Sequence, residues 1–390
     1  MTTTHSPASL IETARAFAPQ IREQYDHIEN ERRLPPTLAK AIAEAGLFRL
    51  MIPKALGGLE VDVETGIRVF EEMSQIDGSV GWCTMIGATG GLVSAYLPDK
   101  VAQEIYGSDP HVITGGALAP TGKAVVVNGG YRVTGRWQFN SGCQHCTWLM
   151  GTCVVMENGG PRRFPNGQPV TTMLIFPAHE AEILDTWSVL GLRGSGSHDI
   201  EVNDLFVPEG RLVSLLYDKP HHDGPLYRFP MFGLLAISVA SIALGMARGA
   251  IDTFVEIAKS KSLAGMPRRV CEREVVQMQV AQAEASLRAG RAFLYETVQA
   301  VWKDVLAKVE ISVHQRALLR LAATHAATTA AHAIDLVYHA AGTSSIWANS
   351  PLQRHFRDVH VLTQHAVLSA PVYELAGRVF FGLKTNPAGI

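Results

Sequence analysis

The chain has 390 residues, of which 47% are hydrophobic and only 18% are charged, and its formal net charge is -2. This length gives room for two or three domains and excludes a mini-protein. With so little net charge the chain carries no basic field for a polyanion, and nucleic acid is not expected as a partner.

The first part of the chain, residues 1–107, is expected to form a helical domain. Apolar residues recur at helical spacing, and Pro35-Pro36 and Gly46 mark the start and the end of one helix. The helical patterns cover residues 7–31, 36–46, 67–74 and 80–96.

The middle part, residues 108–215, is expected to be a β domain, because the apolar period changes there from helical to alternating. Val125–Val127 and Tyr131–Val133 flank Asn128-Gly129-Gly130, which predicts a hairpin whose glycines supply positive φ angles. Further strands are expected at residues 148–156, 172–176, 181–189 and 199–207.

The last part, residues 216–390, is expected to be a helical bundle and the oligomerisation domain. Long helical patterns cover residues 231–262, 271–306, 311–340 and 351–382. Residues 229–247 carry no charge and approach the length of a membrane span. Their Pro, Gly and Ser residues and the lack of aromatic anchors favour a helix buried in a bundle or subunit interface, so no membrane is expected.

Several familiar motifs fail on inspection. The glycines between 191 and 196 lack the spacing of a dinucleotide fingerprint. Cys143 and Cys146 lack the second pair that a zinc site needs, and His325, His332 and His339 lie on an otherwise alanine-rich helix face that is typical of close packing. No metal is therefore expected, and five irregularly spaced cysteines with no signal peptide indicate a cytoplasmic protein.

A strand from Thr134 to Gly142 joins large aromatic residues to small polar ones. This combination suits a planar heterocycle, since a ring needs a stacking surface and its edge needs hydroxyl or backbone donors. On its own the pattern is also typical of a strand core.

Four segments in order resemble the acyl-CoA dehydrogenase superfamily of flavoproteins. They are Ile52–Gly58, Asp77–Trp82, Gly135–Gly142 and Ala340–Ser345, the last leading into Arg354 and Arg357-Asp358. The resemblance implies an acyl-CoA dehydrogenase-like fold, mainly α with an inserted β-barrel, in which an N-terminal helical domain, a middle β-barrel and a C-terminal four-helix bundle follow one another. It also implies a homotetramer or homodimer that binds flavin at a subunit interface.

The family's dehydrogenases use a carboxylate base shortly after the Arg-Asp pair. The corresponding stretch, from Arg357 to Ala366, contains no Asp or Glu after Asp358, and His365 stands near the expected place. The chain therefore resembles the two-component flavin monooxygenases, a branch that includes hydroxylases of 4-hydroxyphenylacetate, 3-hydroxy-secosteroids and indoles and a dibenzothiophene monooxygenase. In this branch a separate flavin reductase supplies the reduced flavin.

The resemblance implies hydroxylation of an aromatic or polycyclic, phenol- or indole-like substrate by O₂ through a flavin C4a-hydroperoxide. FADH₂ is favoured over FMNH₂. His365 would act as acid or base, and the hydroxyl of Ser141 would lie near flavin N5. Flavin contacts are expected from Trp137, Phe139, Asn140, Ser141, Arg268, Gly342, Thr343 and Ser344, with Arg269 and Arg273 as alternatives to Arg268. Substrate contacts are expected from Trp82, Met85, His222 and Tyr227.

Two other functions remain open at this point: a flavin dehydrogenase of acyl thioesters and a non-enzymatic helical scaffold. A tightly bound oxidised flavin would favour the first, and no flavin binding at all would favour the second.

Overall fold

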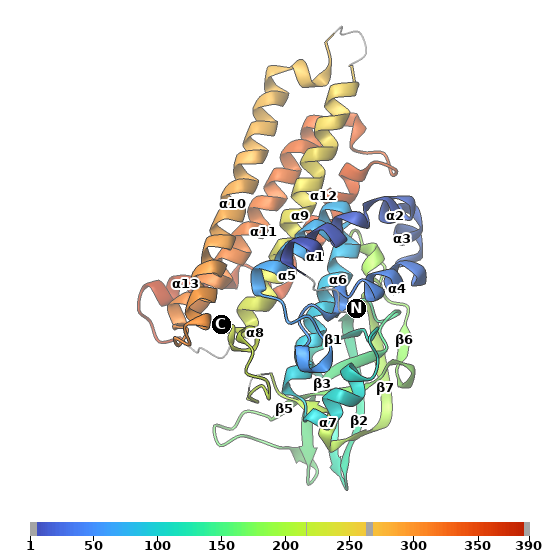
Figure 1. Cartoon of the computed structure of the whole chain (residues 1–390), viewed down its shortest axis with the longest axis vertical. Coiled ribbons are helices and arrows are strands. Elements are labelled where there is room, and N and C mark those ends of the chain that lie inside the picture. The colour runs from blue at the N-terminus through green and yellow to red at the C-terminus, as the bar shows by residue number, and fades with distance from the viewer. Residues whose placement is uncertain (1–5, 216, 263–267, 386–390) are drawn as a thin grey trace.

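The structure, a computed structural model, describes residues 6–215, 217–262 and 268–385. N-terminal helices, a β-sheet and a bundle of long helices follow one another along the chain (Figure 1). The long helices extend away from the sheet, and the N-terminal helices lie along the junction between sheet and bundle. The domain boundaries given above stay predictions.

The helix expected over residues 7–31 is divided in three: the first break precedes Pro19, which lacks the N–H that a continuous helix would use, and the second lies at Gln24. Asp62 and Asp77 then cap two longer helices, each accepting the backbone N–H three residues on. The helices of this part are α1 (Pro7–Ala16), α2 (Ala18–Glu23), α3 (Tyr25–Glu31), α4 (Pro36–Glu44), α5 (Val63–Ile76), α6 (Gly78–Gly90) and α7 (Asp99–Ala102).

The strands form one mixed sheet in the order β6-β7-β2-β1-β3-β5-β8, with β4 paired to β3. This corrects the expected barrel: β6 and β8 end the hydrogen-bonded path, and β1 runs parallel to β3. The predicted hairpin is confirmed, since Val127 pairs with Gly130 and Gly129 has a φ of 76°. The strands are β1 (Thr114–Val127), β2 (Gly130–Asn140), β3 (Trp148–Glu157), β4 (Gly160–Pro161), β5 (Thr171–Pro177), β6 (Glu182–Leu184), β7 (His198–Pro208) and β8 (Leu212–Val213).

The bundle is built around α9 (Met231–Ser260), which packs against α5, α6, α11 and α12. Neighbours surround its first half, and there, up to Ala247, α9 carries no charged residue. It is long and apolar enough to cross a membrane, but 89% of its most apolar window is buried in the structure, as in the core helix of a folded domain. The other helices are α8 (Pro225–Arg228), α10 (Glu274–Leu306), α11 (Val313–Ala341), α12 (Pro351–Leu362) and α13 (Pro371–Phe380).

The last predicted helix, 351–382, is broken, and this correction matters for the site. The chain leaves α12 after Leu362, forms a short 3₁₀ turn at Ala366–Leu368 and enters α13 at Pro371. Proline cannot donate the hydrogen bond that a continuous helix would need at residue 371. The break places His365 in a loop instead of on a helix face.

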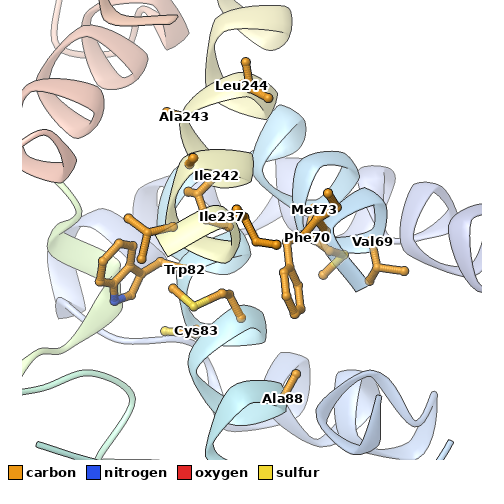
Figure 2. Packing of buried hydrophobic residues seen from close by; sticks show 14 of the residues in the cluster. Val69, Phe70, Met73, Trp82, Cys83, Ala88, Ile237, Ile242, Ala243 and Leu244 are labelled. Carbon is orange, nitrogen blue, oxygen red and sulfur yellow. The ribbon is translucent and has the colours of Figure 1, made fainter. Parts of the chain in front are cut away.

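The junction of the domains is a continuous apolar core. Figure 2 shows Trp82 and Cys83 on α6 close to Ile237 and Ile242 on α9, with Phe70 of α5 in the same cluster. All five of these side chains are buried. α6 is therefore held rigidly between the bundle and the sheet, and the residues at its sheet-facing side have fixed positions.

Candidate active site

Three residues that the sequence singled out lie together where α6 meets the sheet. The indole Nε1 of Trp82 donates a hydrogen bond to the Ser141 hydroxyl at 2.8 Å. The His365 imidazole contacts the same indole edge-on, with ring centroids 5.5 Å apart and planes at 61°. The three residues come from α6, from the turn after β2 and from the loop after α12.

A chain of buried hydroxyls continues from Ser141. The Ser141 Oγ lies 2.7 Å from the Ser197 Oγ, which lies 2.7 Å from the Ser195 Oγ. These serines are 1–5% exposed. The structure thus places the Ser141 hydroxyl against Trp82 and Ser197, and its contact with flavin N5 stays a prediction. The sequence interpretation missed Ser195 and Ser197 because Ser141, to which they connect, lies far away in the sequence.

His365 is oriented from its own loop as well. Its Nδ1 accepts the backbone N–H of Val367 at 3.3 Å, so Nε2 carries the proton in the neutral ring. Loss of water around the ring lowers the pKa of His365 below its ordinary value, although the residue keeps an exposed side. At neutral pH His365 therefore presents a neutral N–H donor at Nε2.

Phe139 is exposed and strained. Simple alternation places Trp137 and Phe139 on one face of β2, but the pairing of β2 with β7 shifts register between Trp137 and Asn140. Phe139 takes a φ of 62°, which is rare for a bulky residue, and its side chain turns outward with 67% of its surface exposed. Strain of this kind persists where the surroundings enforce it and is frequent at functional sites.

The side chains of Trp137 and Asn140 are fully buried, and their contact with a flavin stays a prediction. The Trp137 Nε1 donates to the Thr152 carbonyl at 2.7 Å inside the sheet. The Asn140 amide donates to the Trp137 carbonyl at 2.7 Å and stabilises the turn that carries Phe139. Trp137 is a core residue and Asn140 is a turn residue.

The predicted substrate residues do not form one group. Met85 is 2% exposed and belongs to the core, because it faces the interior of the molecule from α6. Tyr227 is buried, its hydroxyl donates to the Met51 carbonyl at 3.2 Å, and His222 lies beside it with ring centroids 6.4 Å apart. The backbone N–H of the neighbouring His221 donates to the Ala95 carbonyl. Ala95 follows Trp82 by 13 residues, which corresponds to roughly 20 Å of helical rise.

The sequence interpretation missed two residues near Trp82 and the turn after β2, namely Ile86 and Cys146. Ile86 follows Trp82 by one helical turn and is partly exposed on an otherwise buried helix. A side chain added at Gly115 would meet the Cys146 Sγ at 2.9 Å and an Ile86 methyl at 3.8 Å. The helical period could have found Ile86, since residues i and i+4 share a face.

The other predicted cofactor residues lie at the far end of the bundle. Gly342, Thr343 and Ser344 form a short turn after α11, and the Lys261 ammonium donates to the Ser344 hydroxyl. Arg268 is exposed there and pairs loosely with Glu274 at 3.6 Å, whereas Arg269 is bound to Glu272. α12 separates this turn from His365 by about 18 Å of helix.

The remaining candidates have ordinary roles. In the described part of the chain no group of three metal-ligating side chains is found, and Cys143 and Cys146 are free thiols whose pKa values are raised by burial. His360 pairs with Asp335 at 2.8 Å. His145 stacks on Phe48, and burial lowers its pKa to about 4.

Two buried carboxyl groups secure α6 to its neighbours. Asp77 caps α6 and lies 3.4 Å from Arg354, while Asp358 accepts the Leu192 N–H at 2.6 Å. Arg354 and Asp358, one helical turn apart on α12, thus bind different partners. Burial, together with the nearby Asp77, raises the pKa of Asp358 to about 8.

Asp358→Asn is expected to flatten the pH dependence of stability. The folded state holds a proton on Asp358 that the unfolded state releases above an ordinary pKa of about 3.9. Unfolding free energy therefore falls as the pH rises from about 4 to about 8, by an amount on the order of a few kcal/mol. Asparagine cannot ionise and still accepts the Leu192 N–H. Thermal unfolding midpoints at pH 5 and pH 8 measure the effect.

Asp223→Asn, at an exposed position, serves as the control and should keep the pH dependence of the unchanged protein. If the unfolding midpoint changes between pH 5 and pH 8 by the same amount in Asp358→Asn and in the unchanged protein, Asp358 is not the group that causes the pH dependence.

Two family models match the chain: the acyl-CoA dehydrogenase N-terminal domain over residues 4–102 and the acyl-CoA dehydrogenase C-terminal domain over residues 237–370. Indole-3-acetate monooxygenase of Pseudomonas putida is 33% identical, over 98% of this chain and 97% of its own. The oxygenase subunit HsaA, a flavin-dependent monooxygenase of Mycobacterium tuberculosis, is 30% identical over 94% of this chain and 93% of its own.

Among solved structures, XiaF from Streptomyces in complex with FADH₂ and glycerol has a TM-score of 0.89. It is 28% identical and covers 97% of this chain, which covers 96% of XiaF.

Proposed function

The chain belongs to the acyl-CoA dehydrogenase superfamily, as an oxygenase component of its flavin-dependent monooxygenases, and from this premise we propose that it hydroxylates an indole-like aromatic ring with FADH₂. The expected family and fold are confirmed, with a mixed sheet in place of the barrel. The chain is an enzyme, so the scaffold alternative was wrong.

The observation that carries the proposal is His365 presented as a neutral donor against Trp82. A bound reduced flavin would supply the two electrons that activate O₂, and O₂ would supply the oxygen atom. The residues of the chain position and protect that chemistry: the Nε2–H of His365 can hold a proton at the reacting oxygen, and the buried indole of Trp82 keeps water away from one side of the imidazole.

Phe139 fits the flavin ring system. Its exposed, strained side chain contacts Trp187 edge-on with centroids 6.2 Å apart, which provides an apolar edge for a planar molecule. The residues present therefore fit a flavin at the sheet side of the site. At the far end of the bundle, Gly342 has a φ of 55° with open space around it, and Lys261 adds positive charge beside Ser344.

FADH₂ is preferred over FMNH₂ on two grounds. XiaF was solved with FADH₂, and a relative from Rhizobium is an FADH₂-dependent resorcinol hydroxylase. The second ground is the positive charge of Lys261, beside Ser344, and of the exposed Arg268, which would favour the additional phosphate of a dinucleotide. A separate flavin reductase belongs to this proposal, because the relative HsaA is an oxygenase subunit. The homotetramer or homodimer implied by the family resemblance is proposed with it.

The indole-like substrate is supported by the Pseudomonas putida relative, whose substrate is indole-3-acetate. A dehydrogenase of acyl thioesters is disfavoured, since Glu374, the next carboxylate after Asp358, is exposed on α13 and cannot replace the missing base.

The test supplies the full-length protein with FADH₂ from a flavin reductase in ¹⁸O₂ and offers indole-3-acetate, 4-hydroxyphenylacetate and an acyl-CoA. We expect one ¹⁸O atom in the product of the indole or of the phenol, detected by mass spectrometry, and faster turnover with FADH₂ than with FMNH₂. Oxidation of the acyl-CoA to an enoyl product without ¹⁸O would overturn the proposal.

A further inference from the structure

Trp82 lies between His365, the residue proposed to act on the oxygen, and the buried hydroxyls of Ser141, Ser197 and Ser195. The indole is 6% exposed and has one polar atom, Nε1, which is bound to the Ser141 Oγ at 2.8 Å. Its ring contacts the His365 imidazole edge-on at 5.5 Å. Any rotation of the indole would therefore break the Nε1 bond and move the surface on which His365 rests.

The hydroxyl chain makes this orientation specific. Apolar packing resists rotation only by shape, whereas a hydrogen bond has a preferred direction. Ser141 alone could turn its hydroxyl elsewhere, but Ser197 holds it at 2.7 Å, and Ser195 holds Ser197 at 2.7 Å. All three serines are buried, so water does not replace a lost partner easily.

His365 needs such support because its own loop supports it weakly. The loop between α12 and α13 contains exposed residues on both sides of His365, and the Nδ1 contact with the Val367 N–H is long at 3.3 Å. The contact with Trp82 is the ring contact that fixes the imidazole from the rigid side of the site.

We propose that Trp82 is a positioning residue that aligns the His365 imidazole, and that Ser197 and Ser195 act through Ser141 and the Trp82 N–H to fix the plane of the indole. The proposal rests on the proposed function, in which His365 handles a proton during hydroxylation.

The first measurement uses the full-length protein without flavin. In ¹H–¹³C NMR of histidine-labelled protein, the His365 signal is assigned by its loss in His365→Gln and reports the ring current of Trp82. We expect Trp82→Phe and Ser197→Ala each to shift this signal towards that of a solvent-exposed histidine. Trp148→Phe, on β3 beside Arg211, should leave it unchanged.

The second measurement is the ratio of hydroxylated product to H₂O₂ under turnover. Loss of one buried neutral hydrogen bond lowers the aligned population about five-fold, so Ser197→Ala and Trp82→Phe should each lower the ratio by about that factor. The double variant should be no worse than Trp82→Phe alone, because Ser197 acts through the indole N–H. Ser94→Ala, a buried serine outside the chain of hydroxyls, is the matched control.

An unchanged His365 signal in both variants, or additive losses in the double variant, would overturn the proposal. If no ring substrate is hydroxylated by any form of the protein but the NMR shifts appear, the proposed function fails and the positioning of His365 by Trp82 stands.

Discussion

Replacing His365 by alanine is expected to lower the rate of product formation by at least about 10²-fold, which is the usual contribution of one general acid or base. The variant should still consume reduced flavin and O₂, because the exposed Phe139 and the turn at Gly342 are untouched. Reducing equivalents should then appear as H₂O₂. The measurement is a paired assay of product and H₂O₂ at saturating FADH₂.

The matched control for this prediction is His339→Gln. His339 is exposed on α11, contacts Tyr338 and has no contact with Trp82. It should keep the product-to-H₂O₂ ratio of the unchanged protein. Equal product formation in His365→Ala and in the unchanged protein would show that the proton at the reacting oxygen is handled elsewhere.

Replacing Trp137 by alanine is expected to destabilise the protein by about 3–5 kcal/mol, the usual effect of removing a fully buried large aromatic side chain. The indole fills a space that three glycines leave open: a side chain at Gly122, Gly135 or Gly151 would come within 3 Å of it. Alanine would leave a cavity there and an unsatisfied Thr152 carbonyl. Urea unfolding followed by circular dichroism measures the loss.

Trp347→Ala is the control, since Trp347 is 67% exposed and its removal opens no cavity. Should Trp137→Ala fail to accumulate as folded protein, Trp137→Phe gives a milder form of the same test. A variant at Trp137 that keeps its stability and loses only flavin affinity would contradict this prediction and support a contact of Trp137 with the flavin instead.

These two predictions separate residues that look alike in the sequence. Trp137 and His365 both lie in segments that carry the family resemblance. Replacing Trp137 should change stability, because its side chain is fully buried. Replacing His365 should change the fate of the oxygen without a large change in stability, because His365 is exposed.

The sequence by itself determined the order of helices, strands and helices, the hairpin at Asn128-Gly129 and the absence of a carboxylate base after Asp358. Hydrophobic period and turn residues act locally, so they are readable without a structure. The family followed from the same segments, and with it the kind of reaction.

Only the tertiary structure decided which aromatic residue of β2 is exposed. Alternation predicts that the side chains of Trp137 and Phe139 point to the same face of β2. The register shift and the positive φ at Phe139 turn the Phe139 side chain to the opposite side. Likewise, the contacts of Trp82 with Ser141 and His365 join positions far apart in the chain. Such contacts depend on how whole elements pack, and no local pattern encodes them.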